Sequence, residues 1–167
     1  SGKKVVTKPV INSKIISNQN DASAVDTNNK LEIQEKSSLY SWTIQNRNTE
    51  HIIIETENIN GKDVTLSNLK KCLIELQGHP GSLQITNAID CIVLSGPIDR
   101  SLFAEHCSGC VFAVACQQLR LHTSVNCKLH IHVTCRAIIE DCSDIDVGEY
   151  NYYYLHLEED FKQSGLD

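Results

Sequence analysis

A segment of similar composition recurs four times after its first appearance, between residues 66 and 147. Each copy places a cysteine, or in the last copy an isoleucine, after a polar turn and before a short apolar run. The aligned positions are Cys72, Cys91, Cys110, Cys127 and Ile145, whose numbers rise by 19, 19, 17 and then 18. This period is too short for helical hairpin repeats, which need roughly 34 residues. The repeat therefore predicts a solenoid in which each copy stacks on the next.

The strand pattern within each copy identifies the kind of solenoid. The pieces are five or six residues long, alternate between apolar and polar side chains, and are separated by Asn, Gly, Ser or Asp. Three such strands account for about 18 residues, so we expect an all-β parallel β-helix whose coils hydrogen-bond at about 4.8 Å. The residues two and four positions after each aligned residue should then point inward. They are Ile74, Leu76, Val93, Ser95, Phe112, Val114, Leu129, Ile131 and Val147.

The chain divides into a tail and one domain. Residues 1–36 are rich in Asn, Ser, Lys and Asp and keep no period, which predicts a flexible linker. Residues 37–167 form the predicted β-helix domain. Its first strand should include Trp42 and Ile44, and His51–Glu55 is a second short β-branched strand.

The ends of a solenoid need caps, because no coil is stable alone. The N-terminal strands and the aromatic stretch Tyr150–Tyr154 are the expected caps. Asn60-Gly61 is a turn signal. Residues 158–163 read as a short helix that ends near Gly165.

Composition excludes several classes of protein. The net charge of −6 argues against a nucleic-acid-binding surface. The sequence contains no run of eighteen apolar residues, so it predicts no membrane span. The eight cysteines include one Cys-x-x-Cys pair, Cys107 and Cys110, without the second pair of a zinc ribbon; His130 and His132 add only a weak hint of metal. We therefore expect no metal site and read the cysteines as small buried hydrophobes.

Motifs of independent catalysis are missing from the sequence. Gly61-Lys62-Asp63 is only a fragment of a phosphate-binding loop, and there is no Gly-x-Ser-x-Gly elbow. Some parallel β-helices cleave polysaccharides, but Glu105, Glu140 and Asp141 do not form the clustered acids that such an enzyme needs. We expect that the chain is not an enzyme by itself, and keep a carbohydrate enzyme as a third alternative.

Ala115–His122 holds the most suggestive charged side chain. Alternation turns Leu119 and Leu121 inward and Gln118, Arg120 and His122 outward. A rigid strand can then hold the arginine out toward another protein's active site. Glu140 follows one coil later and can hold the guanidinium in place. On pattern alone, all four polar side chains also fit an ordinary solvated surface.

Three stretches carry a resemblance to a known family: Ala113–Arg120, Ala137–Cys142 and Ser164–Asp167. Together they resemble the C-terminal domain of the tubulin-folding cofactor C family. The retinitis pigmentosa 2 protein shares this domain, and cyclase-associated proteins have a similar fold. The resemblance covers roughly residues 40–167 and implies a right-handed parallel β-helix, in agreement with the period.

The resemblance also implies an activity. Family members act as GTPase-activating proteins through an arginine in a Gln-x-Arg motif, here Gln118-Leu119-Arg120, so Arg120 is the expected arginine finger and Gln118 its neighbour at the catalytic site. The family's glutamate corresponds to Glu140, and its C-terminal aromatic to Phe161. His122 shares the face and is expected to support partner binding.

The implied partner is tubulin, acting with tubulin-folding cofactors D and E in the cytoplasm. No cofactor is expected in this chain, because the partner binds the GTP. The alternative is a non-catalytic binding module for tubulin or an Arf-like small GTPase. The sequence lacks methionine and begins Ser1-Gly2, so we expect an excised fragment, in which a lipidation signal at the true N-terminus would be invisible. The N-terminal helical domain that the resemblance implies is absent from the fragment. The tryptophan-containing extension usual after the Gly-Leu segment is also missing, and either truncation is expected to impair activity.

Overall fold

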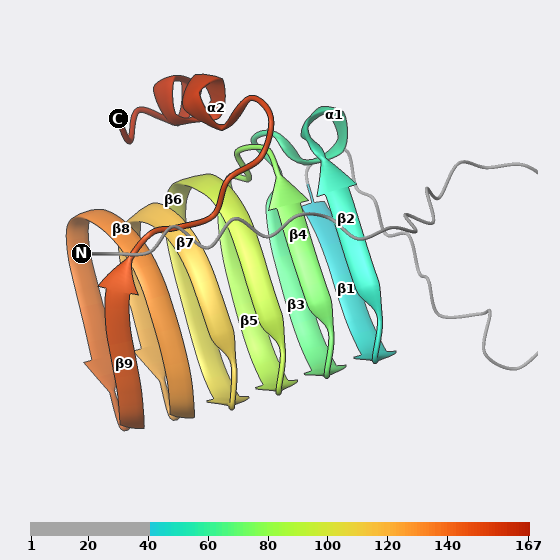
Figure 1. The fold of residues 1–167 in the computed structure, drawn as a ribbon, viewed down its shortest axis with the longest axis vertical. Helices are drawn as coiled ribbons and strands as arrows, with labels where there is room; N and C mark the ends of the chain where they lie inside the picture. The colour runs from blue at the N-terminus through green and yellow to red at the C-terminus, as the bar shows by residue number, and fades with distance from the viewer. Residues whose placement is uncertain (1–40) are drawn as a thin grey trace, which may run out of the picture.

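The computed structural model describes residues 41–167, and they form the predicted parallel β-helix (Figure 1). The predicted linker 1–36 and the domain start at residue 37 lie outside the described residues. All strand pairs are parallel. The elements are β1 Ser41–Asn48, β2 His51–Glu55, α1 Thr56–Ile59, β3 Asp63–Lys70, β4 Leu73–Gln77, β5 Ser82–Ile89, β6 Ile92–Ser108, β7 Val111–His122, β8 Val125–Glu140, β9 Ser143–Glu149 and α2 Leu157–Ser164.

The strand register gives the number of coils. One wall of the solenoid begins at six residues that stack in register: Ser41, Asp63, Ser82, Ser101, Gln118 and Arg136. The first step is the longest, because α1 is inserted between β2 and β3. The predicted turn follows α1, with Gly61 at a φ of 69°. Residues 41–167 therefore stack six coils on this wall.

Each early coil contains two strands, so the prediction of three was wrong. The difference lies at the turns between β1 and β2, or β3 and β4, where two left-handed residues flank a short stretch that stays part of the first strand. Two columns of positive φ run along the solenoid. The first is Asn46, Asn68, Asn87, His106, Thr123 and Asp141; the second is Thr49, Lys71, Asp90, Gly109, Asn126 and Asp144.

Asparagine stabilises the first of these columns. Asn and Asp tolerate left-handed backbone better than other non-glycine residues. The Asn68 side chain donates to Asn46 Oδ1 at 3.2 Å, and that of Asn87 donates to Asn68 Oδ1 at 3.1 Å. The repeat therefore places polar residues at its turns because they adopt the left-handed conformation that bends every coil at the same position.

The aligned cysteines form the predicted inward column. Cys72, Cys91, Cys110 and Cys127 are buried. Their thiols donate to backbone carbonyls, as Cys110 Sγ does to Ala88 O of the preceding coil at 3.3 Å. Neighbouring thiols and burial raise the pKa of Cys110, and burial raises the pKa of Cys116 to about 11. These thiols act as small core side chains, as predicted.

Two predictions about burial fail near the last coils. Cys135 is exposed, and it lies between Val133 and Arg136 of β8, where the register with β7 shifts. Val147 is 58% exposed, and Ile131 is only half-buried. Within residues 41–167 no further coil stacks on β9, so Val147 has a neighbouring strand on one side only, where it pairs with Leu129 of β8.

The aromatic stretch Tyr150–Tyr154 is not an end cap, contrary to prediction. It runs back from β9 across the outside of β8, β7, β6 and β4 before reaching α2 (Figure 1). Tyr150 donates to Ser95 O at 2.8 Å, Tyr152 to Glu75 Oε2 at 2.8 Å and Tyr154 to Asp160 Oδ2 at 2.6 Å. We call this segment the tyrosine strap, because it ties the last coil to the second.

Helix α2 matches the predicted C-terminal helix. Its C-cap is Gly165 in the left-handed region, at a φ of 70°. No helix in the described part of the chain is long and apolar enough to cross a membrane.

Candidate functional site

Arg120 stands on the outer face of β7, as the alternation predicts. Leu119 and Leu121 are 2% and 0% exposed and pack into the core. The Arg120 side chain is 56% exposed. Its register neighbours are Phe103 in the preceding coil and Ile138 in the following one. The strand is therefore paired on both sides, and the arginine projects from the interior of a sheet.

Glu140 meets Arg120 from the next coil. Arg120 Nη2 donates to Glu140 Oε2 at 3.1 Å. The carboxylate lies two residues beyond Ile138, the register partner of Arg120, so the contact is diagonal. An exposed pair of this kind adds little stability. Since a guanidinium has five N–H donors, one bond to Glu140 orients the group and leaves others for a ligand.

The other two predicted residues of this face have different environments. Gln118 is exposed between Ser101 and Arg136 in the register. His122 contacts the corner instead, with Nε2 at 3.1 Å from Asp141 Oδ2 and Nδ1 at 2.7 Å from Thr123 Oγ1. Both ring nitrogens are thus occupied near the bend, so His122 does not contact Arg120.

Arg136 is a member of this face that sequence reasoning missed. It is exposed and pairs in register with Gln118, at the next coil. It follows Gln118 by one repeat period, which was the available signal. Gln118, Arg120 and Arg136 therefore form an outward face with two guanidinium groups, which we call the arginine face.

Phe161 has aromatic neighbours of its own. It packs edge-on against Tyr150 at 5.7 Å and His132 at 5.9 Å between ring centroids. These rings, with Ile131 and Glu149, line an open hollow of about 340 Å³. Among residues 41–167 no hydrogen bond, ion pair or ring contact joins Phe161 directly to Arg120.

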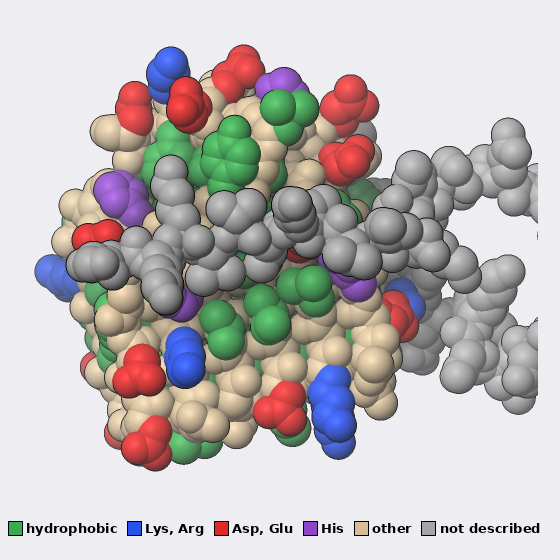
Figure 2. Space-filling view, in the orientation of Figure 1, with side chains coloured by type: hydrophobic (Ala, Val, Ile, Leu, Met, Phe, Trp, Pro, Cys, Tyr) green, Lys and Arg blue, Asp and Glu red, His purple; other side chains and the backbone are tan. Residues whose placement is uncertain are grey.

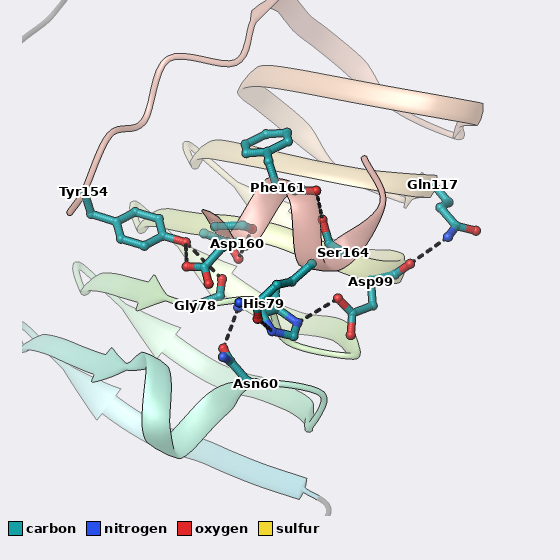
Figure 3. A network of polar contacts seen from close by, with 12 residues as sticks. Asn60, Gly78, His79, Asp99, Gln117, Tyr154, Asp160, Phe161 and Ser164 are labelled. Carbon is teal, nitrogen blue, oxygen red and sulfur yellow. Dashed lines mark hydrogen bonds and ion pairs between the residues drawn. The ribbon is translucent and has the colours of Figure 1, made fainter. Parts of the chain in front are cut away.

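A polar network at a coil corner links α2 to the β7 strand (Figure 3). Gln117 Nε2 donates to Asp99 O at 2.8 Å, and Asp99 Oδ1 lies 3.0 Å from His79 Nδ1. His79 Nε2 lies 3.0 Å from Gln163 Oε1 of α2. The His79 amide donates to Asn60 Oδ1 at 2.9 Å. We call these five residues the corner network.

Sequence reasoning also missed the corner network. His79, Asp99 and Gln117 follow one another at close to the repeat period, but they lack a shared residue type. Gln163 lies 84 residues from His79, and no local pattern indicates that contact.

The arrangement suits electrostatic chemistry. Within residues 41–167 no group of three or more His, Cys, Asp or Glu side chains is placed to hold a metal ion. The arginine face offers a permanently charged, planar donor on a rigid wall. Such a group binds phosphate or carboxylate oxygens in a bidentate manner. The fold and the site together therefore define a parallel β-solenoid domain that carries an exposed arginine on one wall.

Comparison with known proteins places the chain within a family. The family model described as tubulin binding cofactor C matches residues 61–167. The chain belongs to this family. The match includes the arginine face, the corner network apart from Asn60, and α2.

Curated relatives agree with this assignment. Tubulin-specific chaperone C of Homo sapiens is 42% identical over 129 residues, covering 76% of this chain and 37% of the relative. Tubulin-specific chaperone C of Bos taurus is 43% identical with the same coverage. Tubulin-folding cofactor C of Arabidopsis thaliana is 28% identical over 124 residues, or 74% of this chain and 36% of the relative. The chain thus spans less than two fifths of these relatives.

Proposed function

We propose that this domain is a GTPase activator that inserts Arg120 into the nucleotide site of a partner. The observation that carries the proposal is the setting of Arg120. Buried Leu119 and Leu121 fix the strand, and Glu140 holds the exposed guanidinium at 3.1 Å. The charge thus reaches a partner already oriented.

The physics of GTP hydrolysis explains why such an arginine helps. Negative charge spreads over the transferring phosphoryl group, and an arginine supplied in trans stabilises it. A finger of this kind accelerates hydrolysis by roughly 10³- to 10⁵-fold. A strand paired on both sides reorganises little on binding. The conformational entropy of ordering the strand that carries Arg120 is therefore lost during folding and not when the partner binds. Gln118, beside the finger, either orients the arginine or contacts the nucleotide region of the partner.

The proposed partner is tubulin, acting in the cytoplasm in a complex with folding cofactors D and E. Family membership and the names of the relatives, tubulin-specific chaperone C and tubulin-folding cofactor C, support this choice. The domain then stimulates hydrolysis by its partner and is not a hydrolase itself. An Arf-like small GTPase is the alternative partner.

The test compares Arg120 variants in a GTP hydrolysis assay with tubulin and cofactors D and E, run beside an Arf-like GTPase. Arg120→Ala should lose stimulation by about 10³-fold and still bind the complex. Arg120→Lys should fail nearly as badly, because lysine lacks the planar fork.

Arg100→Ala is the matched control for Arg120→Ala, because Arg100 is a similarly exposed arginine, paired with Asp63. It should stimulate hydrolysis like the wild type. Full stimulation by Arg120→Ala would exclude the finger. A wild-type domain that binds the complex without stimulating hydrolysis would favour the non-catalytic binding module.

A further inference from the structure

The corner network makes a continuous connection from α2 to the strand of Arg120. Gln117 occupies the register shift between Cys116 and Gln118, directly before the arginine face. Its side chain holds Asp99, whose carboxylate in turn contacts His79. The contacts along this route are 2.8 to 3.0 Å long (Figure 3).

His79 is the central residue of this connection. Its two ring nitrogens contact different elements, Nδ1 facing Asp99 and Nε2 facing Gln163. Its backbone is held as well, since the amide donates to Asn60 Oδ1 and the carbonyl accepts from the Gly61 amide at 2.8 Å. The side chain is only 15% exposed. The imidazole therefore has a fixed place between the coils and the helix.

The other anchors of α2 hold different parts of it. Asp160, near the start of the helix, is bound by Tyr154 of the strap. The carbonyl of Leu166, beyond the end of the helix, accepts a hydrogen bond from His132 Nε2 at 3.0 Å. The contact between Gln163 and His79 ties the last turn to the coil corner that leads to β7.

We propose that His79 is a positioning residue that sets α2, and the Phe161 that it carries, at a fixed place relative to Arg120. One partner then contacts the helix and receives the arginine in a single docking event. This inference rests on the proposed GTPase-activating function. Figure 2 shows acidic side chains exposed around α2, so the partner surface that meets the helix should carry basic groups.

The two roles predict different kinetics. Arg120 acts in the transition state, whereas α2 acts in binding. His79→Ala should therefore raise KM for the partner complex about tenfold, which corresponds to two lost hydrogen bonds, with kcat within about twofold. Gln163→Ala removes the same contact from the exposed side of the helix and should also raise KM.

Conservative variants separate the two contacts of the ring. His79→Gln places an amide near the Nε2 position and keeps the contact to Gln163. Its KM should therefore lie close to the wild-type value. His79→Asn places an amide near Nδ1, keeps the contact to Asp99 and should resemble His79→Ala. His51→Ala is the control, because His51 also pairs with a carboxylate, Glu75 at 2.7 Å, and should leave KM unchanged.

Backbone amide hydrogen exchange tests the role of His79 without any partner. His79→Ala and Gln163→Ala should speed exchange in Leu157–Ser164 about tenfold, and Arg120→Ala should not. Unchanged exchange in both helix-contact variants, or a fall in kcat in place of a rise in KM, overturns the inference. If the wild type fails to stimulate GTP hydrolysis, the proposed function fails, and the exchange result still decides whether His79 positions α2.

Discussion

The side chain of Arg120 depends on three neighbours with separate tasks. Leu119 and Leu121 anchor the strand in the core, and Glu140 restrains the guanidinium. Alternation alone predicted the inward leucines, because a strand with one buried face admits only one register. The contact to Glu140 required the coil period as well, and the period brought the two residues within one coil of each other.

Glu140→Gln should weaken activation without unfolding the domain. The variant keeps the size of the side chain but loses the charge that orients Arg120. We expect stimulated GTP turnover to fall about threefold to fivefold, the equivalent of a surface pair worth up to about 1 kcal/mol. The free energy of unfolding, measured with urea, should change by less than about 0.5 kcal/mol.

Asp146→Asn is the control for Glu140→Gln, because it removes the same charge from β9. Equal activity of Glu140→Gln and the wild type would show that the carboxylate does not orient the finger.

The strands owe their shared bends to the two left-handed columns. The sequence indicated turns there through Asn, Asp and Gly, but Thr49, Lys71 and Thr123 also adopt positive φ. These residue types disfavour that conformation. Stacking imposes it, since a coil that bent elsewhere would lose register with its neighbours. The short stretch between the two left-handed residues stays part of the first strand of each early coil. The prediction of a third strand was therefore wrong, although the predicted period was right.

Asn68→Ala should destabilise the domain measurably. Alanine pays about 1–2 kcal/mol for the left-handed conformation, and the bonds to Asn46 and Asn87 are lost. Asn68→Gly loses the same bonds without the conformational penalty, so it should cost less. Chemical denaturation of the three proteins measures the difference, and an alanine variant as stable as the glycine variant would contradict the assigned role of the column.

The tyrosine strap runs along one side of the solenoid formed by residues 41–167. The strap joins residues 55 to 77 positions apart in sequence, as in the bonds from Tyr150 to Ser95 and from Tyr152 to Glu75. The coil period carries no information about such contacts, so the aromatic stretch was predicted as a cap. The position of α2 was unpredictable for the same reason, although its length and its glycine end were not.

The strap should make the domain sensitive to alkaline pH. Burial raises the pKa of Tyr152 and Tyr154 above the usual value, so the folded state keeps protons that the unfolded state releases. Stability is then fully present below about pH 10 and falls above it, by about 1.4 kcal/mol per pH unit for each tyrosine. Tyr152→Phe should reduce the slope of the free energy of unfolding against pH, measured by urea unfolding from pH 9 to 11.

Tyr153→Phe is the matched control on the same strap, because Tyr153 is 75% exposed. It should leave the slope unchanged. A slope that Tyr152→Phe does not reduce would contradict the assignment of the alkaline transition to the buried phenols.

The most direct measurement is the single-turnover rate of GTP hydrolysis in the tubulin–cofactor complex, taken at saturating concentrations of this domain. Saturation removes any contribution of binding, so the rate reports the chemical step alone. The wild type should exceed Arg120→Ala by at least about 10³-fold. Equal rates for the two proteins would contradict the claim that this β-helix supplies a catalytic charge.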